Sequence, residues 1–199
     1  RPCCARAEAY GILLFCNSFT PQRLRVTTRS AEFAQRLPKL FKNAFSAEFD
    51  VRPADTSTGG RLSFEVTDPG KMERILETYG YARENSISHH INYAVLEEEC
   101  CRSAFLRGAF LAGGSVTDPE KRYHLELATS HLYVHRELQS LLMDMGFEPK
   151  TVIRNNNYVT YIKRSEAIAD FLTTVGAPLS AMEIMNAKVE KNLRNGVNR

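Results

Sequence analysis

The chain has 199 residues, of which 43 % are hydrophobic and 25 % charged, which is the range of ordinary globular proteins. Charged residues interrupt every apolar run before the roughly 20 residues of a membrane span, and no secretory leader is visible, so we expect a cytoplasmic protein. The net charge of +3 permits nucleic-acid binding without requiring it.

An internal repeat organises the sequence. The doublet Cys3-Cys4 recurs 97 residues later as Cys100-Cys101, and at the same offset Gly11 matches Gly108. Further along, helical patterns in the two halves also match, with Leu37 corresponding to Leu138 and Phe41 to Leu142. Several matches in the same order predict a duplicated domain.

The expected elements follow the same order in both halves. In the first half we expect an apolar helix at residues 4–16, two short strands around the turn Thr20-Pro21-Gln22, and a helix at 31–45. A hairpin that includes residues 61–66 and a helix introduced by Asp68-Pro69 complete this half.

In the second half the corresponding helices are expected at 101–113, at 133–145 and after Ser165. Strands flank a turn at 117–121, and a hairpin at 151–162 turns at Asn155-Asn156-Asn157, because asparagine tolerates the left-handed backbone of a tight turn. The predicted fold class is therefore α+β, with the order αββαββα occurring twice.

The predicted boundaries divide the chain into four parts. Residues 1–82 form the first repeat, 83–99 a linker and 100–180 the second repeat. Residues 181–199 form a C-terminal helix that leads toward further structure.

Small residues lie one helical turn apart in both leading helices, at Ala7 and Gly11 and again at Ala104 and Gly108. Glycine inside a helix costs about 1 kcal/mol relative to alanine, a cost that is tolerated where two backbones approach closely. We therefore predict that the two leading helices pack against each other about a pseudo-two-fold axis.

The motif LRGAFLAGGSV at residues 106–116 resembles the LAGLIDADG motif of homing endonucleases. More narrowly, residues 105–119, 123–126 and 193–199 resemble the WhiA family of bacterial regulators, and the resemblance covers essentially the whole chain. It implies a central pair of motif helices, with each four-stranded sheet forming half of a saddle over double-stranded DNA.

The resemblance to WhiA also implies a biological role. It implies transcriptional control, cell division, chromosome segregation and, in some lineages, sporulation, with a nucleoid-associated location. Sequence-specific DNA binding would rest mainly on a helix-turn-helix domain outside this chain. The resemblance also implies protein partners from the transcription machinery, and it implies no association with a membrane.

In LAGLIDADG nucleases, acidic residues at the ends of the motif helices hold the divalent metal. Counting along the motif places these positions at Cys16 and Gly113, and neither side chain can supply a carboxylate. We therefore expect no enzyme activity, no catalytic metal and no cofactor. An active endonuclease is the less favoured alternative.

The candidate DNA contacts are basic and polar residues on the predicted strands. Arg23, Arg25 and Arg29 share one strand face, while Leu24 and Val26 take the other. The full set of candidates is Arg23, Arg25, Arg29, Arg52, Arg61, Lys150, Arg154, Asn156, Tyr158, Lys163 and Arg164. Because acidic residues share these strands, a protein- or ligand-interaction module that does not itself grip DNA stays open as an alternative.

The five cysteines are an odd number, which favours reduced thiols. Pseudo-symmetry could bring Cys3, Cys4, Cys100 and Cys101 together. Structural zinc sites, however, prefer cysteines separated by two to four residues, so we expect buried thiols at the helix starts and no metal.

Overall fold

The computed structural model describes residues 1–57, 59–81 and 87–197. Within it the chain forms two compact units, Arg1–Gly113 and Gly114–Arg199, which are described separately below. The predicted boundary between first repeat and linker, at residues 82 and 83, lies outside the described residues. The repeat boundaries stay a prediction, because the second repeat's leading helix groups with the first unit.

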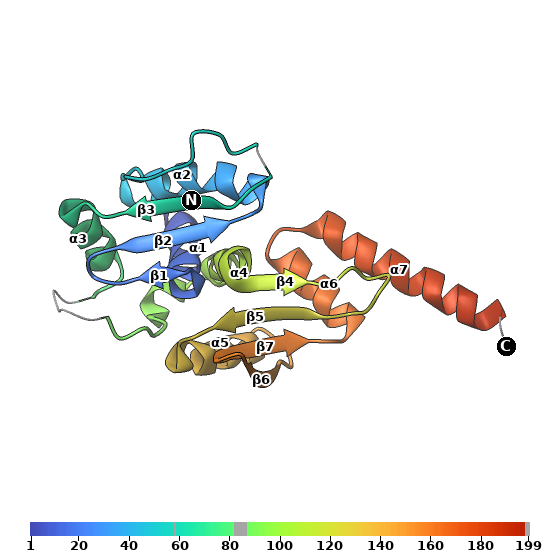
Figure 1. Cartoon of the computed structure of the whole chain (residues 1–199). Helices are drawn as coiled ribbons and strands as arrows, with labels where there is room; N and C mark the ends of the chain where they lie inside the picture. The colour runs from blue at the N-terminus through green and yellow to red at the C-terminus, as the bar shows by residue number, and fades with distance from the viewer. Residues whose placement is uncertain (58, 82–86, 198–199) are drawn as a thin grey trace. The chain divides into compact units, whose positions relative to one another are not determined.

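The first unit contains both predicted leading helices, and Figure 1 shows them side by side as α1 and α4. Its elements in chain order are α1 (Pro2–Phe15), β1 (Ser18–Phe19), β2 (Leu24–Thr28), α2 (Ala31–Phe45), β3 (Leu62–Val66), α3 (Pro69–Thr78), the short 3-10 helix η1 (Tyr93–Leu96) and α4 (Glu99–Gly113). Every residue of α1 from Ala7 to Phe15 is buried, and apart from Glu8 this stretch has no charged side chain, as expected for a helix at the centre of a core.

The helix pair is held by two reciprocal glycine contacts. A Cβ atom added to Gly11 would lie 2.2 Å from the carbonyl oxygen of Phe105, and one added to Gly108 would lie 1.9 Å from that of Glu8. Glu8 and Phe105 are themselves related by the repeat offset of 97 residues. The two contacts are therefore pseudo-symmetric copies, which confirms the predicted helix pair.

A buried carboxylate ties a third helix to this pair. Glu8 of α1 is 2 % exposed and accepts two hydrogen bonds from Arg36 of α2, at 2.6 and 2.8 Å. It also accepts one from Arg107 of α4 at 3.1 Å. Two guanidinium groups thus compensate the burial of one charge and fix α2 against both leading helices.

The sheet of the first unit has three strands in the order β1-β2-β3, all antiparallel. The expected hairpin partner of β3 is reduced to a single bridge between Val51 and Glu65, so the expectation of a four-stranded sheet in this half was wrong. Two residues after Val51, Pro53 has no N–H group to donate, which limits further pairing.

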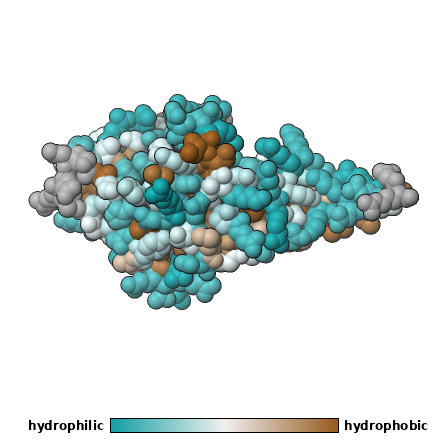
Figure 2. Space-filling model, turned by 90° about the horizontal axis from the view of Figure 1, so that it is seen from below, coloured by the Kyte–Doolittle hydropathy of each residue, from teal (hydrophilic) through white to brown (hydrophobic). Residues whose placement is uncertain are grey.

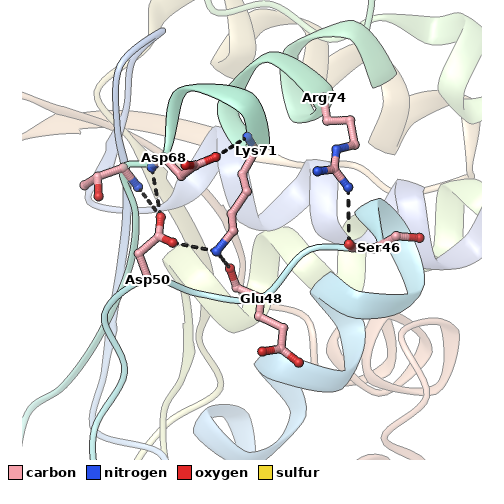
Figure 3. Close-up of polar contacts among 7 residues, drawn as sticks. Ser46, Glu48, Asp50, Asp68, Lys71 and Arg74 are labelled. Atoms are coloured by element: carbon pink, nitrogen blue, oxygen red, sulfur yellow. Dashed lines mark hydrogen bonds and ion pairs between the residues drawn. The ribbon is translucent and has the colours of Figure 1, made fainter.

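The segment around Asp50 occupies the position where the fourth strand was expected, and side-chain contacts hold it there (Figure 3). The carboxylate of Asp50 accepts hydrogen bonds from the backbone N–H groups of Thr67 and Asp68, at 2.8 and 2.9 Å. It also accepts one from the Lys71 ammonium group at 2.5 Å, and Lys71 donates to the carbonyl oxygen of Glu48. Asp50 therefore attaches this segment to the start of α3.

The described part of the predicted linker packs on α1 through Tyr10. The Tyr10 ring stacks on Tyr79 with ring centres 4.3 Å apart. Its hydroxyl donates to the carbonyl oxygen of His90 and accepts from the N–H of Asn92. A buried tyrosine that keeps both hydrogen bonds anchors residues 90–92 to the central helix pair.

The second unit has a four-stranded antiparallel sheet in the order β4-β5-β7-β6. Its elements are β4 (Gly114–Val116), β5 (Leu125–Thr129), α5 (Leu132–Asp144), β6 (Lys150–Arg154), β7 (Asn157–Ile162), α6 (Ser165–Thr174) and α7 (Pro178–Val197). Asn155 and Asn156 have positive φ angles of 51° and 61°, which confirms the predicted left-handed turn.

The C-terminal helix α7 begins at Pro178, three residues before the expected start, and packs on α6. Its buried residues include Ile184. A separate stripe of exposed apolar side chains comprises Leu179, Met182, Met185, Val189, Leu193 and Val197. Figure 2 shows brown, hydrophobic atoms along one edge of the part of the surface that α7 occupies. No helix among the described residues is long and apolar enough to cross a membrane.

The glycine contacts predict a large stability difference between two substitutions. Gly108→Ala is expected to lower the free energy of unfolding by about 3 kcal/mol, because a methyl group would overlap backbone atoms of α1. Gly196→Ala is the matched control, since Gly196 is also helical and a Cβ there meets nothing within 4 Å. Urea denaturation should show the control unchanged or stabilised by up to about 1 kcal/mol. Equal stability of the two variants would contradict the close approach.

The Asp50 contacts predict a pH-dependent contribution to stability. The Lys71 ammonium group, together with the Thr67 and Asp68 amides, outweighs partial burial and lowers the pKa of Asp50 to about 2. The folded-state pKa lies below the unfolded value, so this stabilisation is complete above about pH 4 and is lost as the pH falls toward 2. We expect Asp50→Asn to cost about 1 kcal/mol at pH 7.

The measurement is urea denaturation of wild type and Asp50→Asn at several pH values. The stability difference should shrink below pH 4, while Asp144→Asn, at an exposed residue ending α5, should differ little from wild type throughout. A difference for Asp50→Asn that stays constant down to pH 2 would show that the carboxylate charge has no role.

Candidate nucleic-acid interface

The first candidate surface lies on the face of the β1-β2-β3 sheet opposite the core. Leu24 and Val26 are buried, whereas Arg25 and Thr27 alternate with them on the other face, and Arg23 precedes β2 in the same alternation. The predicted alternation is confirmed for residues 24–27, whereas Arg29 lies beyond the end of β2.

An acidic side chain lies among these basic groups. Glu65 of β3 is paired across the ladder with Arg25, and its Oε1 accepts a hydrogen bond from Arg23 Nη2 at 2.5 Å. Nevertheless, the Nε atoms of Arg23 and Arg25 and the Oγ1 atom of Thr27 are shielded from solvent without a hydrogen-bond partner among the described residues. Buried polar atoms ordinarily have partners, so these three are exceptions, but solvent does not reach them and they are not contact points for a ligand.

The other first-unit candidates lie at the sheet margin. Thr28 and Leu62 form the last pair between β2 and β3, so Arg29 and Arg61 both follow at that end of the ladder. Arg52 follows the bridge residue Val51 and is exposed, as are Arg29 and Arg61. The structure thus brings Arg23 and Arg25 together and leaves the other three arginines around them.

The second candidate surface is centred on Glu126 of β5. Its carboxylate accepts a hydrogen bond from Arg154 Nη2 at 2.5 Å and lies 2.8 Å from His124 Nε2. Tyr161 is paired with both Glu126 and Lys150 in the sheet register, and its ring stacks on His124. Basic, acidic and aromatic groups therefore alternate across one sheet face.

Electrostatics keeps the central carboxylate ionised. Burial alone would raise the pKa of Glu126, but hydrogen bonds from His124 and Arg154 outweigh it and hold this pKa below its ordinary value. Lys163 lies over the Tyr161 ring, with its ammonium nitrogen 5.4 Å from the ring centre. The face therefore combines one fixed negative charge with the cations Lys150, Arg154 and Lys163.

Tyr158 does not belong to this surface. In the sheet register it pairs with Thr129 and Ile153, which places it on the face that packs toward α5. There its ring stacks on His135, with ring centres 5.3 Å apart. Burial lowers the pKa of His135, so Tyr158 is part of an uncharged contact between sheet and helix.

The remaining candidates lie at the ends of elements. Asn156 occupies the exposed hairpin turn, and Arg164 is the N-cap residue of α6, with 71 % of its side chain exposed. The aromatic group on the basic face is Tyr161, which the strand pattern alone did not identify. A two-residue turn at Asn155-Asn156 would have given the register, and therefore the face, of Tyr161.

The two positions expected to lack catalytic acids lie at the ends of the helix pair. Cys16 directly follows α1, and its thiol lies 3.2 Å from the carbonyl oxygen of Leu13 and 3.4 Å from that of Ser18. Burial raises the pKa of Cys16 to about 12, so it stays a neutral thiol. Gly113 is the last residue of α4 and has no side chain.

Sequence and structure comparisons agree on the relationship. The profile of the family described as "WhiA LAGLIDADG-like domain" matches residues 102–194. A relative from Ruminiclostridium cellulolyticum, "Probable cell division protein WhiA", is 35 % identical over 99 % of this chain and 65 % of its own length. The chain thus spans less than two thirds of that relative.

Solved structures share the fold. "Full-length DUF199/WhiA from Thermatoga maritima" matches with a TM-score of 0.74 and 19 % identity, over 96 % of this chain and 61 % of that chain. "I-DmoI in complex with DNA and Mn" matches with a TM-score of 0.63 and 14 % identity, over 88 % of this chain and 97 % of that chain. The chain has the LAGLIDADG homing-endonuclease-like fold and belongs to the WhiA family.

Proposed function

We propose that the chain is a non-enzymatic, DNA-associated domain of a WhiA-type transcriptional regulator. The observation that carries this proposal is the basic face of the β1-β2-β3 sheet, where Arg23 and Arg25 lie opposite the buried Leu24 and Val26, since guanidinium N–H groups suit phosphate oxygens. The DNA-bound state of I-DmoI, which shares the fold, supports the same assignment.

The biological role that we propose follows from the family. It comprises transcriptional control in cell division and chromosome segregation, and in sporulation in some lineages, with the protein located at the nucleoid. In this proposal a helix-turn-helix domain outside the chain supplies most sequence specificity, and contacts with the transcription machinery add to it. The domain described here contributes sequence-independent contacts to the DNA backbone.

The lack of nuclease activity is a separate part of the proposal. Two-metal hydrolysis needs oxygen ligands for hard divalent cations, and the helix-end positions hold a neutral thiol at Cys16 and no side chain at Gly113. The chain would then have the fold of the homing endonucleases without their phosphodiester hydrolysis.

A protein- or ligand-interaction module is the alternative, and the acidic residues within both faces favour it. Glu65 and Glu126 each bind an arginine that the DNA hypothesis assigns to phosphate. In this alternative the faces bind a partner with mixed charges, and DNA is contacted only by other parts of the protein.

Duplex DNA binding by this chain is expected to be weak, with a Kd of about 1–100 µM at physiological salt and steep salt dependence. The measurement is fluorescence anisotropy with labelled duplexes of unrelated sequence over a series of salt concentrations. An absence of binding even at low ionic strength would favour the interaction module and reject the DNA hypothesis.

Replacing Arg23, Arg25 and Arg154 together with alanine should weaken binding to all duplexes and reduce the salt slope by up to about three units. The matched control replaces Lys39, Lys42 and Arg136, which are exposed on α2 and α5 and carry the same total charge. An equal loss of DNA affinity in both triple variants would show that net charge matters and the position of these arginines does not.

In the intact protein, unchanged promoter occupancy after the first triple substitution would support the interaction module.

Removing the competing acids should have the opposite effect. Glu65→Gln and Glu126→Gln release Arg23 and Arg154 from their ion pairs, so we expect DNA affinity to rise by about 3- to 10-fold at low salt. Glu183→Gln, at an exposed residue of α7, is the charge-matched control. No gain beyond the control would show that these arginines do not reach the DNA.

Purified protein is expected not to nick supercoiled plasmid in the presence of Mg²⁺ or Mn²⁺. An active homing endonuclease with its own target serves as the positive control for the assay. Metal-dependent nicking that copurifies with the protein through successive columns would overturn the assignment of a non-enzymatic domain.

A further inference from the structure

Four cysteines, two from each repeat, meet at the start of the helix pair. Cys3 and Cys4 lie in the first turn of α1, and Cys100 and Cys101 lie in the first turn of α4. The four sulfur atoms all lie within 4.8 Å of one another, and those of Cys3 and Cys4 are 4.0 Å apart. The expectation that all four thiols are buried was wrong, because only Cys101 is buried, Cys3 is exposed, and Cys4 and Cys100 are intermediate.

The spacing of the sulfurs fits a single tetrahedral ion. With Zn–S bonds of about 2.3 Å, a tetrahedral site places its sulfurs about 3.8 Å apart. The observed upper limit of 4.8 Å exceeds this by only about 1 Å, which rotation of cysteine side chains about χ1 can close. Among the described residues this is the one group of three or more potential ligands gathered closely enough for a metal.

The ligand type selects the class of ion. Four thiolates in tetrahedral array are typical of Zn²⁺, whereas Mg²⁺, Mn²⁺ and Ca²⁺ require oxygen ligands. A four-iron cluster is larger than a single ion and holds its cysteine sulfurs further apart than this group does. A soft, single divalent ion therefore fits these four residues best.

The surroundings supply positive potential for thiolates. The N-terminal ends of two helices carry partial positive charge from their unpaired N–H groups, and thiolates at such positions are stabilised. The guanidinium group of Arg1 adds a contact of 3.9 Å to the sulfur of Cys100. Glu98 and Glu99 oppose this effect from the same end of α4, so the ligand geometry carries the argument.

We propose that Cys3, Cys4, Cys100 and Cys101 bind one Zn²⁺ ion, which links the first turns of the two leading helices. Each thiol that coordinates the ion releases its proton to solvent, so binding becomes stronger as pH rises. The site lies at the opposite end of α1 from Cys16, about 20 Å away along the helix axis. Its role is structural, because it joins the two repeats.

The first test measures metal binding by the chain purified under reducing conditions. We expect one zinc per chain by mass spectrometry of the metal content, and its release by a thiol-modifying reagent. Replacement with Co²⁺ should give the intense sulfur-to-metal charge-transfer bands of a tetrahedral thiolate site. Fully reduced protein that binds neither ion stoichiometrically would overturn the proposal, as would disulfides among these cysteines in protein isolated with thiol trapping.

Two substitutions and one control assign the ligands. Cys3→Ser, at an exposed residue, should lower zinc affinity by more than the roughly 10- to 100-fold that outer-shell changes cause. Cys101→Ser should do the same, and Cys16→Ser is the matched control from outside the cluster. Zinc should raise the Tm of wild type and of Cys16→Ser but not that of Cys3→Ser. Loss of zinc from the control, or full retention by Cys3→Ser, would contradict the assignment.

Discussion

The contact between the backbones of α1 and α4 is the constraint on which the rest of the first unit depends. Because Gly11 and Gly108 let the helices touch, Glu8 can accept hydrogen bonds from both Arg107 of α4 and Arg36 of α2. The same approach brings the two cysteine doublets together at one end of the pair. Core packing, a buried ion pair and a candidate metal site thus share a single origin.

Much of this architecture could be predicted from the sequence, for local reasons. The repeat offset identified the glycine pair, and α2 has the predicted bounds, with Ser30 as its N-cap. The reduced strand at Val51 could not be predicted, because it depends on Asp50 reaching backbone amides 17 and 18 residues away. The face of Tyr158 depends on the hairpin register, and the convergence of the cysteines depends on tertiary packing.

Each sheet face combines basic groups with one carboxylate that holds an arginine in place. Glu65 orients Arg23, and Glu126 orients Arg154, so neither guanidinium loses much side-chain freedom if it binds a phosphate. The same carboxylates reduce the positive potential of the face. This arrangement favours contacts that are well oriented but weak, as the proposed role beside a separate sequence-specific reader requires.

The glycine contacts also limit how this sequence can change over evolutionary time. In most cores a larger side chain on one helix can be offset by a smaller one on its neighbour. Gly11 and Gly108 instead face carbonyl oxygens of the partner backbone, which no substitution can make smaller. No second mutation can therefore compensate for a larger side chain at either position. Each repeat constrains the other even as their remaining residues diverge.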